Sequence, residues 1–284
     1  MSRTERKDQA QVTLRVAREG AYEHDGRRVS LSPWLERCVE GTRVHRPEGL
    51  TRLLEERQAG GDGGTPPRVE VTAERTDEAA IRLWRGAPDR SVVLLNFASA
   101  KNPGGGFLGG ARAQEEDLAR ASALYPALER ASEYYEANRA CGTPLYTDHV
   151  IHSPAVPFFR DASGAFHPEP VPLSVITAPA PNAGVALERN PEDGPAVRET
   201  LRRRAGMVLA VAADEGHRQL VLGPWGCGVF RNDPRVVADV FADWLEGPSF
   251  AGDFDTVIFA AWSSKAQDAN RRAFEHRFAS WRAA

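Results

Sequence analysis

The sequence predicts an α/β fold on three grounds. Along the chain, segments in which apolar and polar residues alternate, as in strands, are followed by segments in which apolar residues recur at helical spacing. Residues 91–97 are continuously apolar, which is typical of a strand buried on both faces of a sheet. Two glycine-rich loops, 104–106 and 223–230, each follow an apolar strand, where α/β proteins place their ligands.

The N-terminal segment is mostly polar and predicts little sheet. We expect a helix over 3–18, a turn at Asp25-Gly26 between two short extended stretches, and a helix over 49–58. The glycine-rich run 60–67 is typical of a flexible linker. We therefore divide the chain into an N-terminal helical extension and linker over 1–65 and a main domain over 66–284, with both forming one compact unit.

The elements of the main domain follow from apolar spacing. Val69, Val71 and Ala73 alternate as in a strand, and the polar-apolar pattern of 77–85 indicates a helix before the buried strand 91–97. Leu118, Ala121, Leu124 and Leu128 predict one long helix over 117–139. Further strands are expected at 149–153, 156–160, 173–178, 219–222 and 256–261, with helices at 195–215, 234–244 and 269–282.

Composition restricts the functional class. The formal charge of −3 offers no general electrostatic footprint for nucleic acid, so an anionic ligand needs a local, preorganised pocket. Cys38, Cys141 and Cys227 are too few for a disulfide framework, and we see no leader segment and no membrane span. The composition indicates a reduced, cytoplasmic enzyme with no direct sequence-specific nucleic-acid partner and no membrane partner.

The most informative motif combines glycines with acids. Gly104-Gly105-Gly106 is followed, after seven residues, by Gln114-Glu115-Glu116 at the start of the long predicted helix. Glycines let backbone N–H groups approach an anion closely, and the loop 223–230 could hold the other side of the same diphosphate. The competing interpretations are that both loops are tight turns and that the acids are solvated residues at a helix N-terminus.

The protonation of the paired carboxyls depends on two opposing effects. A carboxylate beside bound phosphates is penalised as an anion, so its pKa should rise, as suits a general acid. The helix dipole favours the anion and acts the other way. The sequence does not decide between them.

Two nucleotide-binding motifs can be compared with the first loop. Gly104-x-Gly106-x-x-Gly109 fits the dinucleotide fingerprint by its letters, but its helix should begin within the glycines and a ribose-binding acid should end a following strand. Here a long predicted helix occupies that interval. A P-loop is excluded because no Gly-Lys-Ser/Thr follows the glycines.

Other reactive residues carry weaker signals. His149 and His152 lie three apart on a predicted strand, so their side chains should point to opposite faces and not share a metal. Cys227 has no base nearby in the sequence, which argues against a nucleophile. Phe230 follows the second loop and could either close over a ribose or base, or pack in the core.

The glycine-acid motif resembles the signature of poly(ADP-ribose) glycohydrolases, in particular their compact microbial branch. Leu95 to Ala100 before the glycines, Ser122 to Tyr125 after the acids, and Gly223 to Phe230 are similar to that branch too. The resemblance covers about residues 69–261. It implies a macrodomain-like, three-layer α/β/α catalytic domain with a mixed central sheet, preceded by the N-terminal helical extension.

The resemblance also implies roles for individual residues. Glu116 would be the catalytic acid, Glu115 would hydrogen-bond the terminal ribose, and Gln114 would hold the loop and the glutamates. Residues around the ligand are implied in two groups. Those at the reacting ribose are Ala100, Asn102, Gly104, Gly105 and Gly106, and those around the diphosphate are Gly223, Gly226, Cys227, Gly228, Val229 and Phe230. The adenine would lie near 71–76 and 260–264.

The expected activity is hydrolysis of the ribose–ribose bond of poly(ADP-ribose), from chain ends, with release of ADP-ribose. Glu116 would act as general acid and then as general base, and neither a metal nor a cofactor is expected. Poly(ADP-ribosyl)ated proteins would be the substrates, in a response to DNA damage. The alternatives are a non-catalytic reader of ADP-ribose and a hydrolase of another ADP-ribosyl linkage.

Overall fold

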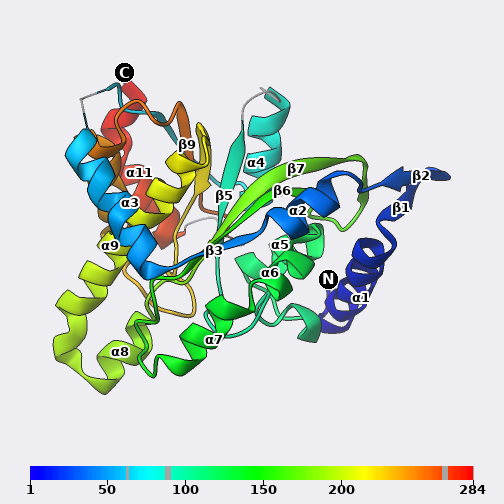
Figure 1. Cartoon of the computed structure of the whole chain (residues 1–284), viewed down its shortest axis with the longest axis horizontal. Coiled ribbons are helices and arrows are strands. Elements are labelled where there is room, and N and C mark those ends of the chain that lie inside the picture. Colours follow the sequence, from blue (N-terminus) through cyan, green and yellow to red (C-terminus); the bar gives the residue numbers. More distant parts are fainter. Residues whose placement is uncertain (62–63, 87–90, 264–267, 284) are drawn as a thin grey trace.

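The computed structural model describes residues 1–61, 64–86, 91–263 and 268–283, and it has a central sheet between two helical layers (Figure 1). Parts of the predicted linker (62–63) and of the predicted adenine region (264) lie outside these residues. The sheet strands are β3 (Arg43–His45), β4 (Arg68–Thr72), β5 (Val92–Phe97), β6 (Val150–Arg160), β7 (Phe166–Ala178), β8 (Gln219–Leu222) and β9 (Thr256–Ala260).

The central sheet is mixed, as predicted. Its strand order is β3-β6-β7-β5-β8-β9-β4. The five strands from β7 to β4 run parallel, whereas β6 is antiparallel to both of its neighbours. The carboxyl ends of β5, β8, β9 and β4 therefore meet at one edge, where parallel sheets place ligands.

Helices cover both faces of the sheet, and each face has its own core. One face packs against α3 (Pro47–Gly60), α9 (Gly194–Asp214), α10 (Pro234–Glu246) and α11 (Ala269–Arg277), and the other against α2 (Trp34–Gly41), α4 (Thr76–Gly86), α5 (Gln114–Ala121), α6 (Leu124–Arg130) and α7 (Ser132–Ala140). Alternate residues of β5 divide between them: Val93 and Leu95 join the first core, and Val92 and Leu94 the second. The three-layer prediction is confirmed.

The segment of the first 30 residues lies at one end of the molecule (Figure 1). It contains α1 (Arg3–Glu19) and, around Asp25-Gly26, the hairpin of β1 (Ala21–His24) and β2 (Arg27–Ser30), close to their predicted positions. The strand β3 was not predicted, and it pairs with β6 at the edge of the main sheet. The division of the chain at residue 65 stays a prediction.

The single long helix predicted over 117–139 is wrong. The chain forms α5, α6 and α7 instead, with breaks at Ser122 and Ala131. Ser122 forms a bridge with Phe158, and the Ala123 N–H donates to the Pro157 carbonyl at 3.1 Å. Pairing with β6 thus draws the chain out of helical geometry, which apolar spacing cannot reveal.

Smaller differences have similar causes. The two strands predicted at 149–153 and 156–160 are one strand, β6, with an irregularity between Ser153 and Val156. The last helix ends at Arg277 and continues as a 3-10 turn over Ala279–Ala283, so the predicted helix 269–282 is too long. The sequence analysis also missed α2 and α8 (Ala183–Arg189). Among the described helices, none is long and apolar enough to cross a membrane.

Candidate active site

The segment that joins β5 to α5 carries the glycine-acid motif. The strand ends at Phe97 and the helix begins at Gln114, so glycines and acids lie at the carboxyl edge of the sheet. Gln114 fixes their relative position. Its side-chain oxygen accepts from the Phe97 N–H at 2.8 Å, and its side-chain nitrogen donates to the Leu95 carbonyl at 2.8 Å. Both the oxygen and the nitrogen of the side-chain amide are thus bound to the backbone of the last residues of β5.

Glu115 is buried beneath the loop, with 3% of its surface exposed. Its Oε2 accepts from the Ser99 N–H at 2.7 Å, and its Oε1 accepts from the Asn96 side chain at 3.3 Å. Burial raises the pKa of Glu115 to about 8, and these hydrogen bonds only partly oppose the rise. Desolvation therefore prevails over the hydrogen bonds that favour the anion, and the pKa of this carboxyl lies well above that of an ordinary glutamate.

Glu116 is 8% exposed and is bound at one oxygen only. Its Oε1 accepts from the Gly106 N–H at 2.8 Å. Its Oε2 is buried and has no hydrogen-bond partner among the described residues. Since a buried polar atom without a partner is costly, this oxygen is available to a ligand.

The first glycine loop binds the protein's own acids. The N–H groups of Ser99 and Gly106 donate to Glu115 and Glu116, and that of Gly104 also lowers the pKa of Glu115. At Gly105 φ is +60°, and a Cβ there would lie 2.5 Å from Glu116 Oε1 and 3.0 Å from Glu115 Oε2. Close approach to the carboxyls therefore requires glycine here. This geometry favours the role at the reacting ribose over a phosphate cradle.

The second glycine loop has unoccupied donors. Within the described chain, the N–H groups of Gly228, Val229 and Phe230 make no hydrogen bond, and Val229 is 85% exposed. Successive free N–H groups form a concavity that binds anions. At Gly226 φ is +72°, and a Cβ there would overlap Ala180 and Asn232.

The second loop is held from below by its neighbours. Trp225 is fully buried and donates from Nε1 to the Ala178 carbonyl at 3.1 Å. Asn232 donates to the Pro181 carbonyl at 2.9 Å. The loop is thus fixed to the end of β7 while its tip remains free for a ligand.

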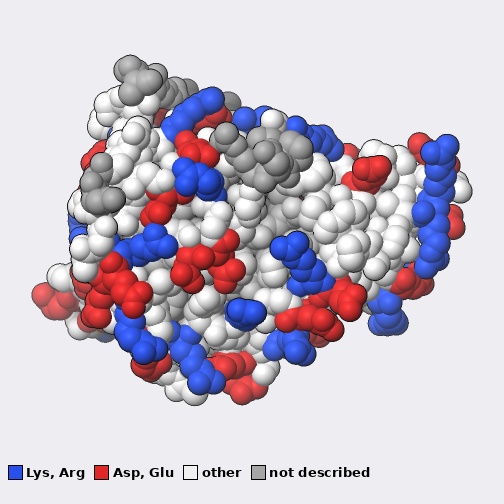
Figure 2. Space-filling view, turned by 45° about the horizontal axis from the view of Figure 1, so that its top comes forward, with Lys and Arg blue, Asp and Glu red and all other residues white. Residues whose placement is uncertain are grey.

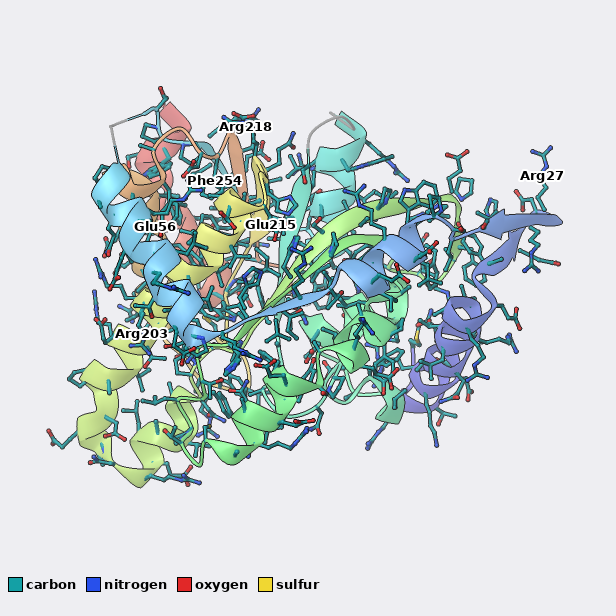
Figure 3. The ribbon with its side chains drawn as sticks, in the orientation of Figure 1. Arg27, Glu56, Arg203, Glu215, Arg218 and Phe254 are labelled. Atoms are coloured by element: carbon teal, nitrogen blue, oxygen red, sulfur yellow. The ribbon has the colours of Figure 1, made fainter. Side chains whose placement is uncertain are left out.

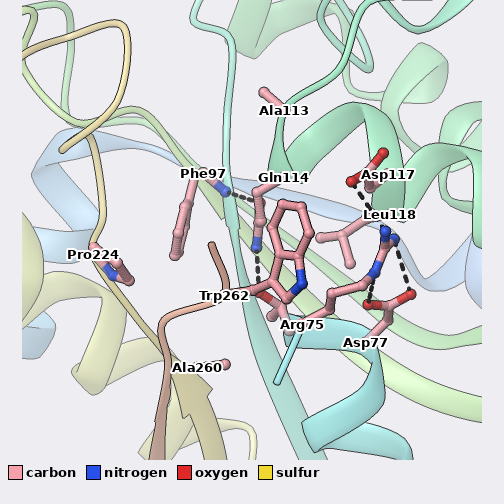
Figure 4. A pocket seen from close by; sticks show the side chains of 11 residues that line it. Arg75, Asp77, Phe97, Ala113, Gln114, Asp117, Leu118, Pro224, Ala260 and Trp262 are labelled. Carbon is pink, nitrogen blue, oxygen red and sulfur yellow. Dashed lines mark hydrogen bonds and ion pairs between the residues drawn. The ribbon is translucent and has the colours of Figure 1, made fainter. Parts of the chain in front are cut away.

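A cavity of about 200 Å³ lies between the start of α5, the second loop and the ends of β4 and β9 (Figure 4). Gln114 lines it from the acid motif and Pro224 from the second loop. The remaining lining is partly apolar and partly charged: Arg75, Thr76, Asp77, Phe97, Ala113, Asp117, Leu118, Ala260 and Trp262. The cavity falls on both predicted adenine regions.

The other predicted ligand residues differ in how far they are exposed and in what they contact. Ala100 is buried, with 2% exposure, whereas Asn102 is exposed and its carbonyl accepts from the Gly105 N–H at 3.0 Å. Phe230 packs at 5.8 Å, ring centre to ring centre, against Tyr146. Burial raises the pKa of the Cys227 thiol well above its usual range, consistent with the absence of a nucleophilic role.

The two predicted structural histidines bind different partners. His149 Nδ1 lies 2.9 Å from the Thr147 hydroxyl. His152 Nε2 lies 3.0 Å from His217 Nε2, and its Nδ1 is 3.6 Å from Glu215, which follows α9 (Figure 3). His149 and His152 therefore do not converge. Among the described residues, no group of three or more acids, histidines and cysteines is arranged to hold a metal.

Three residues near the site were missed by the sequence analysis. Asn96 and Ser99 bind Glu115, and a polar residue at the end of an apolar strand is the signal that could have identified Asn96. Tyr146 has φ of +61°, which is rare for a tyrosine and has no sequence signature. Charges of both signs are interspersed over the face in Figure 2.

Comparison with known proteins places this geometry in a family. Residues 10–161 match the family described as microbial-type PARG, catalytic domain, where PARG is poly(ADP-ribose) glycohydrolase. The chain is similar to PARG from Thermomonospora curvata, at 44% identity and a TM-score of 0.91, over 97% of this chain and 100% of that one.

Complexes of relatives extend the comparison. Another T. curvata PARG structure, bound to the inhibitor ADP-HPD, has 44% identity and a TM-score of 0.89, over 97% and 100% of the two chains. PARG from Deinococcus radiodurans in complex with ADP-ribose has 47% identity and a TM-score of 0.81, over 89% of this chain and 99% of that one. A comparison with curated proteins gave no significant match.

Proposed function

The chain belongs to the microbial-type poly(ADP-ribose) glycohydrolases, and from this membership we propose that it removes ADP-ribose from the ends of poly(ADP-ribose) with Glu116 as the catalytic acid. It is therefore a glycosidase, like the other members of this family. Its proposed natural substrates are poly(ADP-ribosyl)ated proteins. One observation carries the assignment of Glu116: its Oε1 accepts a hydrogen bond, whereas its buried Oε2 has no partner among the described residues.

The proposed reaction uses this one carboxyl twice. Glu116 gives its proton to the 2′ oxygen of the departing ribose as the bond to the anomeric carbon breaks. A water molecule then adds to the anomeric carbon and returns a proton to the Glu116 carboxylate. Protons and atoms balance, and the products are ADP-ribose and a polymer shortened by one unit.

Glu115 supports the ribose without attacking it. Because its raised pKa keeps it mostly protonated, it is a poor nucleophile and a good hydrogen-bond donor. The adjacent positions of Glu115 and Glu116 on one segment also cannot place carboxyls on both faces of a sugar. We assign to Glu115 a hydrogen bond to the terminal ribose, and to Gln114 the positioning of the acid pair on β5.

The remaining parts of ADP-ribose fit the other features of the site. The free N–H groups of the second loop suit the diphosphate. The cavity between Phe97 and Trp262 offers aromatic surface for the adenine, with Thr76 and Asp77 as polar partners. Since Gln114 and Pro224 both line that cavity, one extended ligand can span it, the second loop and the acid pair.

The test compares wild type with Glu116→Gln in release of ADP-ribose from purified poly(ADP-ribose), with calorimetric ADP-ribose binding on both. We expect turnover to fall by about 10²-fold to 10⁴-fold in the variant while affinity stays within a few-fold. If the Glu116→Gln variant retains turnover, Glu116 is not the catalytic acid. Binding by wild type without any release would identify a reader, and release only from singly modified acceptors would identify another linkage.

A further inference from the structure

The N-terminal helix α1 packs directly on the catalytic segment. Ala10 of α1 is fully buried with Phe107 and Ala119, which lie before and after the acid pair. Thr13 donates from its hydroxyl to the Arg120 carbonyl at 2.9 Å. The helix therefore contacts both the turn that follows the glycines and the helix that carries the glutamates.

Two arginines of α1 bind the backbone of that turn. Arg3 donates from Nε to the Gly109 carbonyl at 3.0 Å, and Arg6 donates from Nε to the Gly110 carbonyl at 2.9 Å. Three residues apart, they share one face of α1. Ser2 caps this helix end, with its hydroxyl accepting from the Glu5 N–H at 3.2 Å, so the arginines extend from an ordered first turn.

The turn so held determines where Glu116 is bound. The Gly106 carbonyl accepts from the N–H groups of Gly109 and Ala111, at 3.0 and 3.1 Å, so residues 106–111 form one closed turn. The N–H of the same Gly106 is the donor to Glu116 Oε1. Within the described chain, the hydrogen bond from the Gly106 N–H fixes the Glu116 carboxyl. A shift of the turn therefore shifts the carboxyl.

We propose that Arg3 and Arg6 are positioning residues, through which α1 holds the turn 106–111 and thereby the carboxyl of Glu116. The inference rests on the proposed catalytic role of Glu116. Arg3 and Arg6 lie before residue 10, where the family match begins, so the family assignment does not include them. Misplacement of a catalytic group by about 1 Å can cost about 100-fold in rate, so such a clamp has a measurable effect.

The kinetic test uses the double variant Arg3→Met/Arg6→Met, which keeps the side-chain stems and removes both donors. We expect kcat on poly(ADP-ribose) to fall by about 10-fold to 100-fold, with KM and ADP-ribose affinity nearly unchanged. In the variant Arg3→Met/Arg6→Lys, part of the lost kcat should be recovered, because a lysine can also donate to the Gly110 carbonyl. The matched control is Arg18→Met, an exposed arginine in the last turn of the same helix, which should retain wild-type kinetics.

A second measurement does not depend on activity. Amide hydrogen exchange of residues 106–111 should become faster in the double variant, while residues 226–232 keep their wild-type rates. Unchanged exchange in the turn, or unchanged kcat, would overturn the positioning role. Turnover retained by Glu116→Gln would instead overturn the proposed catalytic acid, so the two failures are distinguishable.

Discussion

The first glycine loop, 104–106, and the second, 223–230, follow neighbouring parallel strands, and both precede a helix. In the first case the N–H groups of Gly106 and of Ser99, which precedes the loop, donate to Glu116 and Glu115, whereas in the second the N–H groups of 228–230 make no hydrogen bond within the described chain. Similar loops thus lie against the protein's own carboxyls in one case and leave backbone donors unoccupied in the other. A glycine-rich loop indicates that some group approaches the backbone closely, and it does not indicate which group.

The largest expected effect concerns the acid held by the first loop. The pKa of Glu115 is about 8 in the folded protein, against 4.5 for an ordinary glutamate. Between these values the folded state keeps a proton that the unfolded chain has lost, so the contribution of Glu115 to the free energy of unfolding should fall as pH rises through this window. The expected fall is on the order of 3–5 kcal/mol.

Urea denaturation between about pH 4.5 and 8.5 measures this dependence. Glu115→Gln should lack this contribution, because a glutamine does not titrate, so the free energy of unfolding of wild type minus that of the variant should fall between these pH values. The buried His152 and His217, whose pKa values are lowered to about 3 and about 4, titrate alike in both proteins and cancel in this difference. Glu136→Gln, on the exposed face of α7, is the matched control and should keep the wild-type slope. A wild-type slope in Glu115→Gln would show that burial does not keep the Glu115 carboxyl protonated.

The second prediction places a side chain into the first loop. In Gly105→Val the new Cβ would displace both carboxyls, so turnover should fall by about 100-fold or more. ADP-ribose affinity should fall less, because in the proposed binding mode the diphosphate contacts the second loop. Gly49→Val, on the exposed side of α3 with open space around it, is the control. A loss of affinity as large as the loss of turnover would restore the first loop to phosphate binding.

The smallest expected effect tests the second loop alone. Inorganic pyrophosphate should bind weakly, with a Kd on the order of millimolar, because it carries the charge of the ligand without its sugars or base. Amide chemical shifts should change at 228–230 and remain constant at 104–106. Shifts confined to 104–106 would reverse the roles of the two loops.

Much of the fold follows from local pattern. Buried parallel strands such as β5 and β8 have continuous apolar runs, and α1 and α10 have caps that mark where they begin, so their positions were predicted closely. The motif from Gly104 to Glu116 was also identified, since its spacing is carried by the sequence. The breaks at Ser122 and Ala131 were not, because they depend on contacts with β6 or on neighbouring turns.

The sequence by itself determined the α/β class, the acid pair and the two loops, because residue type and spacing encode local conformation. Only the tertiary structure decided which donors are occupied, that Glu115 is desolvated while Glu116 keeps a free oxygen, and that Arg3 and Arg6 reach the turn 106–111. Burial and hydrogen bonding between distant segments depend on how the sheet brings them together. Those long-range contacts set the pKa of Glu115 and the position of Glu116.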